Sequence, residues 1–438
     1  MKTTPVRATL PVWSPWRTVI WFGIVSLAAD MVYEGARSIT GPYLASLGAS
    51  ALVVGVVTGA GEAAALVLRL VFGPLADRSG AYWPLTIVGY GMTAVCVPLM
   101  AVAPFLGGVG LAFGATMVLL ERTGKAVRSP SKSALLAHAA RSVGRGKGFA
   151  VHKALDQVGA FAGPLLVAGV VALTTHTWAG LAALAVPAVA AMVLLAVIRV
   201  RVPDMRVYDA PEPASLEPAS LETASLVTGS READVALDVP APPAGAAPTS
   251  TAVAGRHRLP REFHLFALSC AASTLGLMTF GLIGFHLSDA GLVRPALVPV
   301  VYAVAMAVEA VSALATGLRY DRVGPRVLLV LPFLVALVPL LALADQLAVA
   351  LVGVLVWGAA VGVQDSTVKA LVADLVPAPR LATAYGVFAA WQGAAALAGG
   401  LLAGALYGGG RWDLVVVLGA CQVASLVLLV VVLRRRDG

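Results

Sequence analysis

Charged residues are scarce in this chain. Of its 438 residues only 12% are Asp, Glu, Lys or Arg, whereas 59% are hydrophobic, and the mean hydropathy is +0.88. Soluble domains carry roughly 25% charged residues, so a chain of two or three soluble domains is excluded. The composition is typical of a membrane protein with many spans, and the bilayer is its expected surroundings.

Cysteine and the common catalytic motifs are also scarce. Cys96, Cys270 and Cys421 each lie in an apolar run, without the spacing of a metal site or of a disulfide framework. There is no G-x-x-x-x-G-K-[ST] loop, no H-E-x-x-H motif and no set of nucleophile, histidine and acid. These absences argue against an enzyme and against an ATP-driven engine, and we expect neither a metal nor a cofactor.

The net charge of +8 does not indicate nucleic-acid binding, because the basic residues gather at the ends of apolar runs. One set of alternate loops carries nearly all of them: Arg78; Arg128, Lys132, Arg141, Arg145 and Lys147; Arg199 and Arg201; Arg319, Arg322 and Arg326; Arg380; and Arg434, Arg435 and Arg436. By the positive-inside rule this pattern predicts a multi-pass protein of the cytoplasmic (inner) cell membrane with both termini in the cytoplasm.

Twelve apolar runs are long enough to cross a bilayer, which takes about 20 residues. We expect spans over 17–45, 51–72, 85–104, 108–127, 148–172, 178–199, 263–287, 293–316, 326–344, 347–372, 382–407 and 412–433.

Residues 200–262 differ from the rest, since they are rich in Pro, Ala and Ser and repeat the letters ASLE. Such a segment buries too little apolar surface to order itself. We therefore predict an N-terminal six-helix bundle over 1–199, a disordered cytoplasmic linker over 200–262 and a C-terminal six-helix bundle over 263–438.

The two halves repeat a loop motif. The letters GPLADRSG at 73–80 return as GLRYDRVG at 317–324, each after the second span of its half. Both halves start on the same side, so the repeat is parallel, about an axis along the membrane normal.

Twelve spans, a 6+6 duplication, a central linker and two G-x-x-x-D-R-x-G loops resemble the major facilitator superfamily. The resemblance implies an all-α membrane protein of two six-helix bundles related by a pseudo-two-fold, expected as a monomer, that moves a small molecule by alternating access. It also implies that the repeated loops latch the cytoplasmic side in the outward-facing state. The implied gating residues are Gly73, Asp77, Arg78, Gly317, Asp321 and Arg322.

Two further motifs extend the resemblance. The letters ERTGKAVRSPSKSALLA at 121–137 are similar to a branch of bacterial and archaeal facilitators, although Lys132 and Ser133 stand where that branch has Arg and Asp. Its charged residues join the candidate gate: Glu121, Arg122, Lys125 and Arg128. Gly159, Gly163 and Pro164 resemble the G-x-x-x-G-P motif of the antiporters in the superfamily and favour export.

Three charges interrupt the first span at Asp30, Glu34 and Arg37. Their spacing of i, i+4 and i+7 puts them on one helical face, which must point into the bundle or a wet cavity, because each charge costs roughly 2.5–3.5 kcal/mol in lipid. Arg37 neutralises one carboxylate and leaves the other to bind a proton. The proposed proton-coupling residues are Asp30, Glu34, Arg37, Glu62 and Asp156.

A second set of polar and aromatic residues in the spans is predicted to line a substrate cavity: Tyr33, Arg69, His152, Lys153, Tyr302, Glu309, Trp357, Asp365 and Trp391. The alternative for both sets is a network of ion pairs and packing contacts that only holds the helices together. Intramembrane charge is denser in the N-terminal half, which is where we expect proton coupling.

Three functions remain open on the sequence. The first is a proton-coupled antiporter that exports a small amphipathic or drug-like molecule. The second is a proton symporter that imports an organic anion bound by Arg37, Arg69 or Lys153. The third is a non-transporting receptor or scaffold on the same fold.

Overall fold

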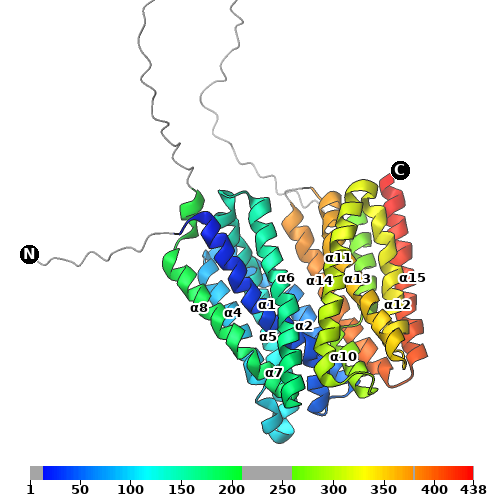
Figure 1. The fold of residues 1–438 in the computed structure, drawn as a ribbon. Helices are drawn as coiled ribbons and strands as arrows, with labels where there is room; N and C mark the ends of the chain where they lie inside the picture. Colours follow the sequence, from blue (N-terminus) through cyan, green and yellow to red (C-terminus); the bar gives the residue numbers. More distant parts are fainter. Residues whose placement is uncertain (1–12, 210–258, 378–379, 438) are drawn as a thin grey trace, which may run out of the picture. The chain divides into compact units, whose positions relative to one another are not determined.

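The computed structural model describes residues 13–209 and 259–437 except 378–379, and every regular element in these ranges is a helix (Figure 1). Most of the predicted linker, residues 210–258, lies outside the described residues. The first half contains α1 (Pro15–Ser46), α2 (Ala51–Val67), α3 (Arg69–Ser79), α4 (Tyr82–Met100), α5 (Gly110–Arg141), α6 (Arg145–Thr174), α7 (Thr177–Ala183) and α8 (Ala185–Arg201). The second contains α9 (Arg261–Gly276), α10 (Phe280–Asp289), α11 (Val298–Val323), α12 (Val330–Ala342), α13 (Leu347–Leu375), α14 (Leu381–Tyr407) and α15 (Arg411–Asp437).

Local sequence sets several helix ends. α1 starts at Pro15 behind Ser14, whose hydroxyl accepts a hydrogen bond from the Arg17 amide, and α2 starts behind Ser50 in the same way. α3 ends at Gly80, whose φ of 64° lies in the left-handed region that glycine adopts without strain. The positions of the helices follow the apolar runs of the sequence closely.

Within the described ranges, ten helical segments are long and apolar enough to cross a membrane by length and composition. α5 is not among them because it carries many charges, and the segment Pro295–Ala342 holds both α11 and α12. The chain is thus a multi-pass, all-helical membrane protein throughout its described residues.

The continuous α5 corrects one expectation from the sequence. Residues 128–141 were predicted as a basic loop, but they prolong the helix to Arg141 in spite of Pro130. The reason is packing against α4, where a Cβ added at Gly89 would collide with Arg128 and with the carbonyl of Gly124. The close contact keeps α5 beside α4, and Leu135, Leu136, Ala139 and Ala140 are buried further along it.

Helix contacts in the first half have counterparts in the second. α1 packs against α6 and α8 as α9 packs against α14 and α15, and α4 packs against α5 as α12 packs against α13. Between the halves, the contact of α2 with α14 is matched by that of α6 with α11. This pairing is what a duplicated six-helix unit produces.

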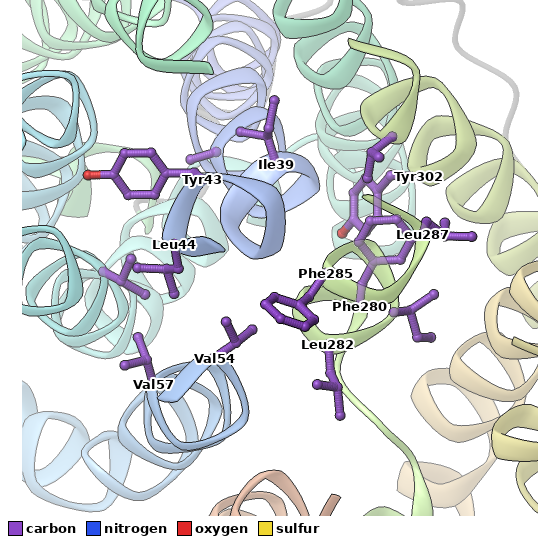
Figure 2. Close-up of a cluster of buried hydrophobic side chains, with 14 of the residues drawn as sticks. Ile39, Tyr43, Leu44, Val54, Val57, Phe280, Leu282, Phe285, Leu287 and Tyr302 are labelled. Carbon is purple, nitrogen blue, oxygen red and sulfur yellow. The ribbon is translucent and has the colours of Figure 1, made fainter. Parts of the chain in front are cut away.

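The halves meet through a hydrophobic cluster at one end of the cavity described below. In Figure 2 Phe285 of α10 lies next to Val54 of α2, and Phe280 lies beside Tyr302 of α11. Tyr43 of α1 points away from α10 and donates to the Met100 carbonyl. The cluster also includes Ile39, Leu44, Val57, Leu282 and Leu287. Glycine backbones bring the helices this close: an added Cβ at Gly41 would overlap Gly281, and one at Gly55 would overlap Gly400.

A short 3₁₀ helix, η3 (Met205–Asp209), folds back on the first half after α8. Tyr208 bonds with Thr18 at 2.7 Å and donates to the Trp13 carbonyl at 2.8 Å. The Asp209 carboxylate contacts His138 at 2.8 Å and Arg141 at 3.2 Å, and these partners, His138 first, hold the pKa of Asp209 below its usual range. The chain therefore leaves the first half tied to both α1 and α5.

The glycines of α6 give a direct test of packing. A Cβ at Gly163 would overlap the Met31 carbonyl of α1, whereas Gly169, six residues on, has open space around it. We expect Gly163→Leu to lower the stability by about 1–3 kcal/mol through overpacking. Gly169→Leu, the matched control, should leave the thermal unfolding midpoint of the purified protein in detergent near that of wild type. Equal effects of the two variants would contradict the described α1–α6 contact.

Candidate functional site

A cavity of about 1290 Å³ lies between the two halves and is lined by α1, α2, α3, α5 and α6 on one side and by α9, the break after it, α11, α13 and α14 on the other. Its lining extends to Gly73, Pro74 and Asp77 of α3 and to Thr383 of α14. In the opposite direction it reaches Met278, Met306 and Trp357, which belong to the hydrophobic cluster, but not Ile39 or Phe285.

The charged face of α1 borders this cavity, as its spacing predicts: Asp30, Glu34 and Arg37 are all lining residues. The nearest carboxylate to Arg37 is on another helix. Arg37 lies 3.1 Å from Glu62 of α2 and 3.7 Å from Glu34. Glu62 therefore provides the nearest counter-charge.

The network continues into α5 through Arg122. Its guanidinium lies 3.6 Å from Glu62 and 3.6 Å from Glu121, and it donates a short hydrogen bond to the Tyr33 hydroxyl. Arg37 and Arg122 thus share Glu62, and Arg122 itself is buried. Removing Glu62 would leave two cations facing each other.

One hydrogen bond joins this network to the second half. The Tyr302 hydroxyl of α11 donates to the Glu34 carboxylate at 2.5 Å. Tyr302 is fully buried and stacks edge-on against Phe280, with ring centroids 4.5 Å apart. The state of Glu34 is therefore connected directly to the packing of the hydrophobic cluster.

A second polar cluster lies one turn nearer the N-terminal end of α1. The carboxyl groups of Asp30 and Asp156 are close enough to interact. Asp156 accepts a hydrogen bond from Ser26 at 2.7 Å and pairs with Lys153 at 2.9 Å, and Lys132 donates to Ser26 at 3.1 Å. Two carboxyl groups in contact repel when both are ionised, so the pair is suited to holding one proton.

The wall from the second half carries few charges. Glu309 and Asp365 line it, together with Thr274, Gln364 and Gln392. Gln364 donates to Thr274 at 3.3 Å, and Thr274 bonds to Gln392. The break between α9 and α10 also reaches the cavity, and there Trp357 donates from Nε1 to the Met278 carbonyl at 2.8 Å.

Most of the predicted proton and substrate residues face the cavity. The lining includes Asp30, Tyr33, Glu34, Arg37, Glu62, Arg69, Lys153, Asp156, Glu309, Trp357, Asp365 and Trp391. Two do not line it. Tyr302 lies behind Glu34, and His152 is buried without a hydrogen-bond partner on either ring nitrogen in the described structure.

The candidate gate is dispersed. Lys125, Arg128, Gly73 and Asp77 line the cavity, and Glu121 and Arg122 belong to the buried network. Asp77 accepts a hydrogen bond from Tyr82 at 3.1 Å, and Gly73 and Gly317 stand in open space. Arg78, Asp321 and Arg322 lie near the ends of α3 and α11, away from the lining. Gly159 and Gly163, by contrast, contact the α1 backbone.

Sequence reasoning missed the neutral polar residues. Ser26, Gln364 and Gln392 have no charge to mark them, yet each bonds within the site. A glutamine inside an apolar run was an available signal, because a buried amide needs partners. Lys132 was placed in a loop, and its approach to Ser26 depends on the extra length of α5.

The family follows from comparison with known proteins. A model described as Major Facilitator Superfamily matches residues 21–344 and 265–438. The chain belongs to the Major Facilitator Superfamily and is a membrane transporter of that type, which argues against the receptor alternative and against an enzyme.

Among individual relatives, an uncharacterised protein of Mycobacterium tuberculosis is 50% identical over 425 residues, 97% of this chain and 95% of the relative. An uncharacterised MFS-type transporter of Methanocaldococcus jannaschii is 26% identical over 151 residues, which are 34% of this chain and 36% of that one.

Solved structures share the fold at low identity. The nucleoside transporter NupG aligns with a TM-score of 0.59 and 13% identity over 95% of this chain and 98% of its own. A POT family transporter in complex with 5-aminolevulinic acid aligns with a TM-score of 0.67 and 12% identity over 94% of this chain and 96% of its own. A bacterial homolog of the human lysosomal transporter Spinster, in its inward-facing and occupied conformation, aligns with a TM-score of 0.62 and 13% identity over 96% of each chain.

The network around Glu62 leads to a stability prediction. Glu62→Gln leaves Arg37 and Arg122 without their shared carboxylate, so we expect a loss of about 1–3 kcal/mol. The control is Asp374→Asn, which weakens the exposed pair with Arg436 and should cost less than about 1 kcal/mol. Thermal unfolding in detergent measures both. A midpoint in Glu62→Gln no lower than in Asp374→Asn would show that the network is not stabilising.

Proposed function

We propose that the protein is a proton-coupled antiporter that exports a small amphipathic, drug-like molecule by alternating access. The observation that carries this proposal is the contact between the carboxyl groups of Asp30 and Asp156 at the wall of the cavity. One proton held between two carboxylates relieves their repulsion, so the pair is the proton site.

The neighbours of the pair assign the proton to Asp30. Asp156 already accepts from Ser26 and Lys153, which favour its ionised form. Asp30 then donates to Asp156 when protonated. A cationic or neutral substrate bound beside Asp30 competes with that proton, and this competition exchanges one for the other as the cavity changes sides.

The orientation of the bundle supports alternating access, since it assigns the cavity to one side of the membrane. The cavity reaches toward the end of the helices that carries Asp77 and the basic residues Arg78, Arg141 and Arg322. Under the positive-inside rule that end is cytoplasmic, so the conformation is inward-open. Twelve spans result if α5 crosses the inner membrane and α11 and α12 cross separately, with both termini then in the cytoplasm.

The glycines of the antiporter-like motif lie where α6 packs against α1 beside the carboxyl pair. Gly159 and Gly163 allow α6 to approach the Leu27 and Met31 carbonyls of α1, on either side of Asp30 in the sequence. The same glycines thus help to bring Asp156 and Asp30 together.

One observation favours the second function, import of an organic anion with protons. Arg69 and Lys125 line the cavity without a carboxylate at ion-pair distance among the described residues. The direction of transport decides between the two: an imposed gradient, acidic outside, drives an antiporter's substrate outward and a symporter's substrate inward.

Asp30→Asn tests the proton site. We expect the variant to fold and to bind substrate, but to lose the infrared band of a protonated carboxyl that wild type shows in difference spectra between acidic and alkaline pH. In proteoliposomes it should also lose transport driven by a pH gradient, because Asn cannot exchange a proton.

Two variants serve as controls for that experiment. Glu34→Gln should keep the band and impair coupling less, because Glu34 bonds to Tyr302 and lies apart from the carboxyl pair. Asp413→Asn, at the start of α15, should behave as wild type. Gradient-driven transport at the wild-type rate in Asp30→Asn would overturn the assignment.

The composition of residues 210–258 supports a plain tether between the two bundles. We expect that replacing 210–255 by a shorter Gly/Ser spacer leaves the thermal midpoint and transport rate unchanged. Loss of both in the shortened protein would mean that this segment docks on the helices.

A further inference from the structure

The cavity presents unbalanced charges of opposite sign on its two walls. The first half contributes Arg69 from α3 and Lys125 and Arg128 from α5, and the second contributes Glu309 from α11 and Asp365 from α13. Other charged residues of the lining have polar partners, among them Arg37 with Glu62, Lys153 with Asp156 and Lys132 with the Ser26 hydroxyl.

The three cations differ from Arg37 and Arg122 in lacking a carboxylate partner at ion-pair distance within the described ranges. Lys125 lies over the Tyr33 ring, 3.5 Å from its centroid. Arg128 donates to Thr93 and lies over the Tyr90 ring at 4.9 Å. The Nε of Arg69 is buried and has no hydrogen-bond acceptor in the described structure.

Burial makes this arrangement unfavourable without an anion. Arg128 is only 4% exposed, and a buried cation without a counter-charge is strongly destabilising. Aromatic faces attract a cation but accept few of its hydrogen bonds. A planar carboxylate or a phosphate would satisfy the free donors of the two guanidinium groups.

The opposite wall carries carboxylates that lack a cationic partner. The Oε2 atom of Glu309 is buried without a hydrogen-bond donor in the described residues. Glu309 and Asp365 are also close enough to repel each other electrostatically. A protonated amine between them would relieve the repulsion and donate to the free oxygen.

We propose that the substrate is amphoteric: it carries an anionic group, which binds at Arg69, Lys125 and Arg128, and a protonated amine, which binds at Glu309 and Asp365. This inference rests on the proposed transport function and names its substrate class. The cavity exceeds the roughly 300–1,000 Å³ of common ligand pockets, so a drug-sized molecule fits with water around it. Trp357 and Trp391, both lining residues, provide apolar surface between the two poles.

Binding to a matched set of compounds tests the substrate class. The probes are para-aminomethylbenzoic acid and the longer aminomethyl-biphenyl carboxylic acid, each with its N-acetyl derivative, which lacks the cation, and its carboxamide, which lacks the anion. Titration calorimetry on the purified full chain, at one pH and without a gradient, measures affinity. We expect at least one amphoteric probe to bind about tenfold or more tightly than either of its derivatives.

Variants then assign each group to its wall. Arg69→Gln should weaken binding of the amphoteric probe and of the N-acetyl derivative, and leave the carboxamide unchanged. Glu309→Gln should weaken the amphoteric probe and the carboxamide, and leave the N-acetyl derivative unchanged. Arg17→Gln and Asp413→Asn, which lie outside the cavity, should change none of them.

Three results would overturn the proposal: no binding of either amphoteric probe, equal affinity across a set of three, or the same response of all compounds to both wall variants. These outcomes are separate from proton coupling. The infrared band of Asp30 requires no substrate. The assignment of the proton site can therefore be confirmed when the amphoteric substrate class is contradicted, and the substrate class can be confirmed when the proton site is contradicted.

Discussion

A charge inside a bilayer needs a partner or water, and this requirement organises the whole first half of the protein. α1 carries two acids and a base in its middle, so α2, α5 and α6 must each bring a complementary group to it. Glu62 of α2 pairs with Arg37, Arg122 of α5 pairs with Glu62 and bonds to Tyr33 of α1, and Lys153 of α6 pairs with Asp156. The helices that carry these groups surround the cavity. The need to pair these buried charges thus helps to determine how the helices of the first half are arranged.

The second half follows a different logic. It contributes broad apolar surface, a broken helix at Met278 and a few neutral amides, and it meets the first half chiefly through the hydrophobic cluster and through glycine backbones. Among the described residues, the hydrogen bond of Tyr302 with Glu34 connects it to the ion network. One half therefore concentrates the titratable chemistry, while the other shapes the space opposite it.

Much of this could be predicted from the sequence, because apolar run length and charge spacing act locally. The run boundaries located the helices, and the i, i+4, i+7 spacing placed Asp30, Glu34 and Arg37 on the cavity wall. Partners could not be predicted, since Glu62 outcompetes Glu34 for Arg37 only through the tertiary position of α2. The same holds for α5, where contact with Gly89 overrides Pro130, and for Asp156, whose encounter with Asp30 depends on how two helices cross.

The contact between α2 and α14 is made of bare backbone. An added Cβ at Gly55 or Gly59 would overlap α14, and one at Gly400 or Gly404 would overlap α2. Along these four glycines backbone faces backbone, and the Val67 side chain of α2 lies against Gly393 of α14 further along the same contact. The attraction there is short-ranged and weak per contact. Small shifts of one helix along the other therefore cost little, whereas separating the two helices removes the contacts altogether.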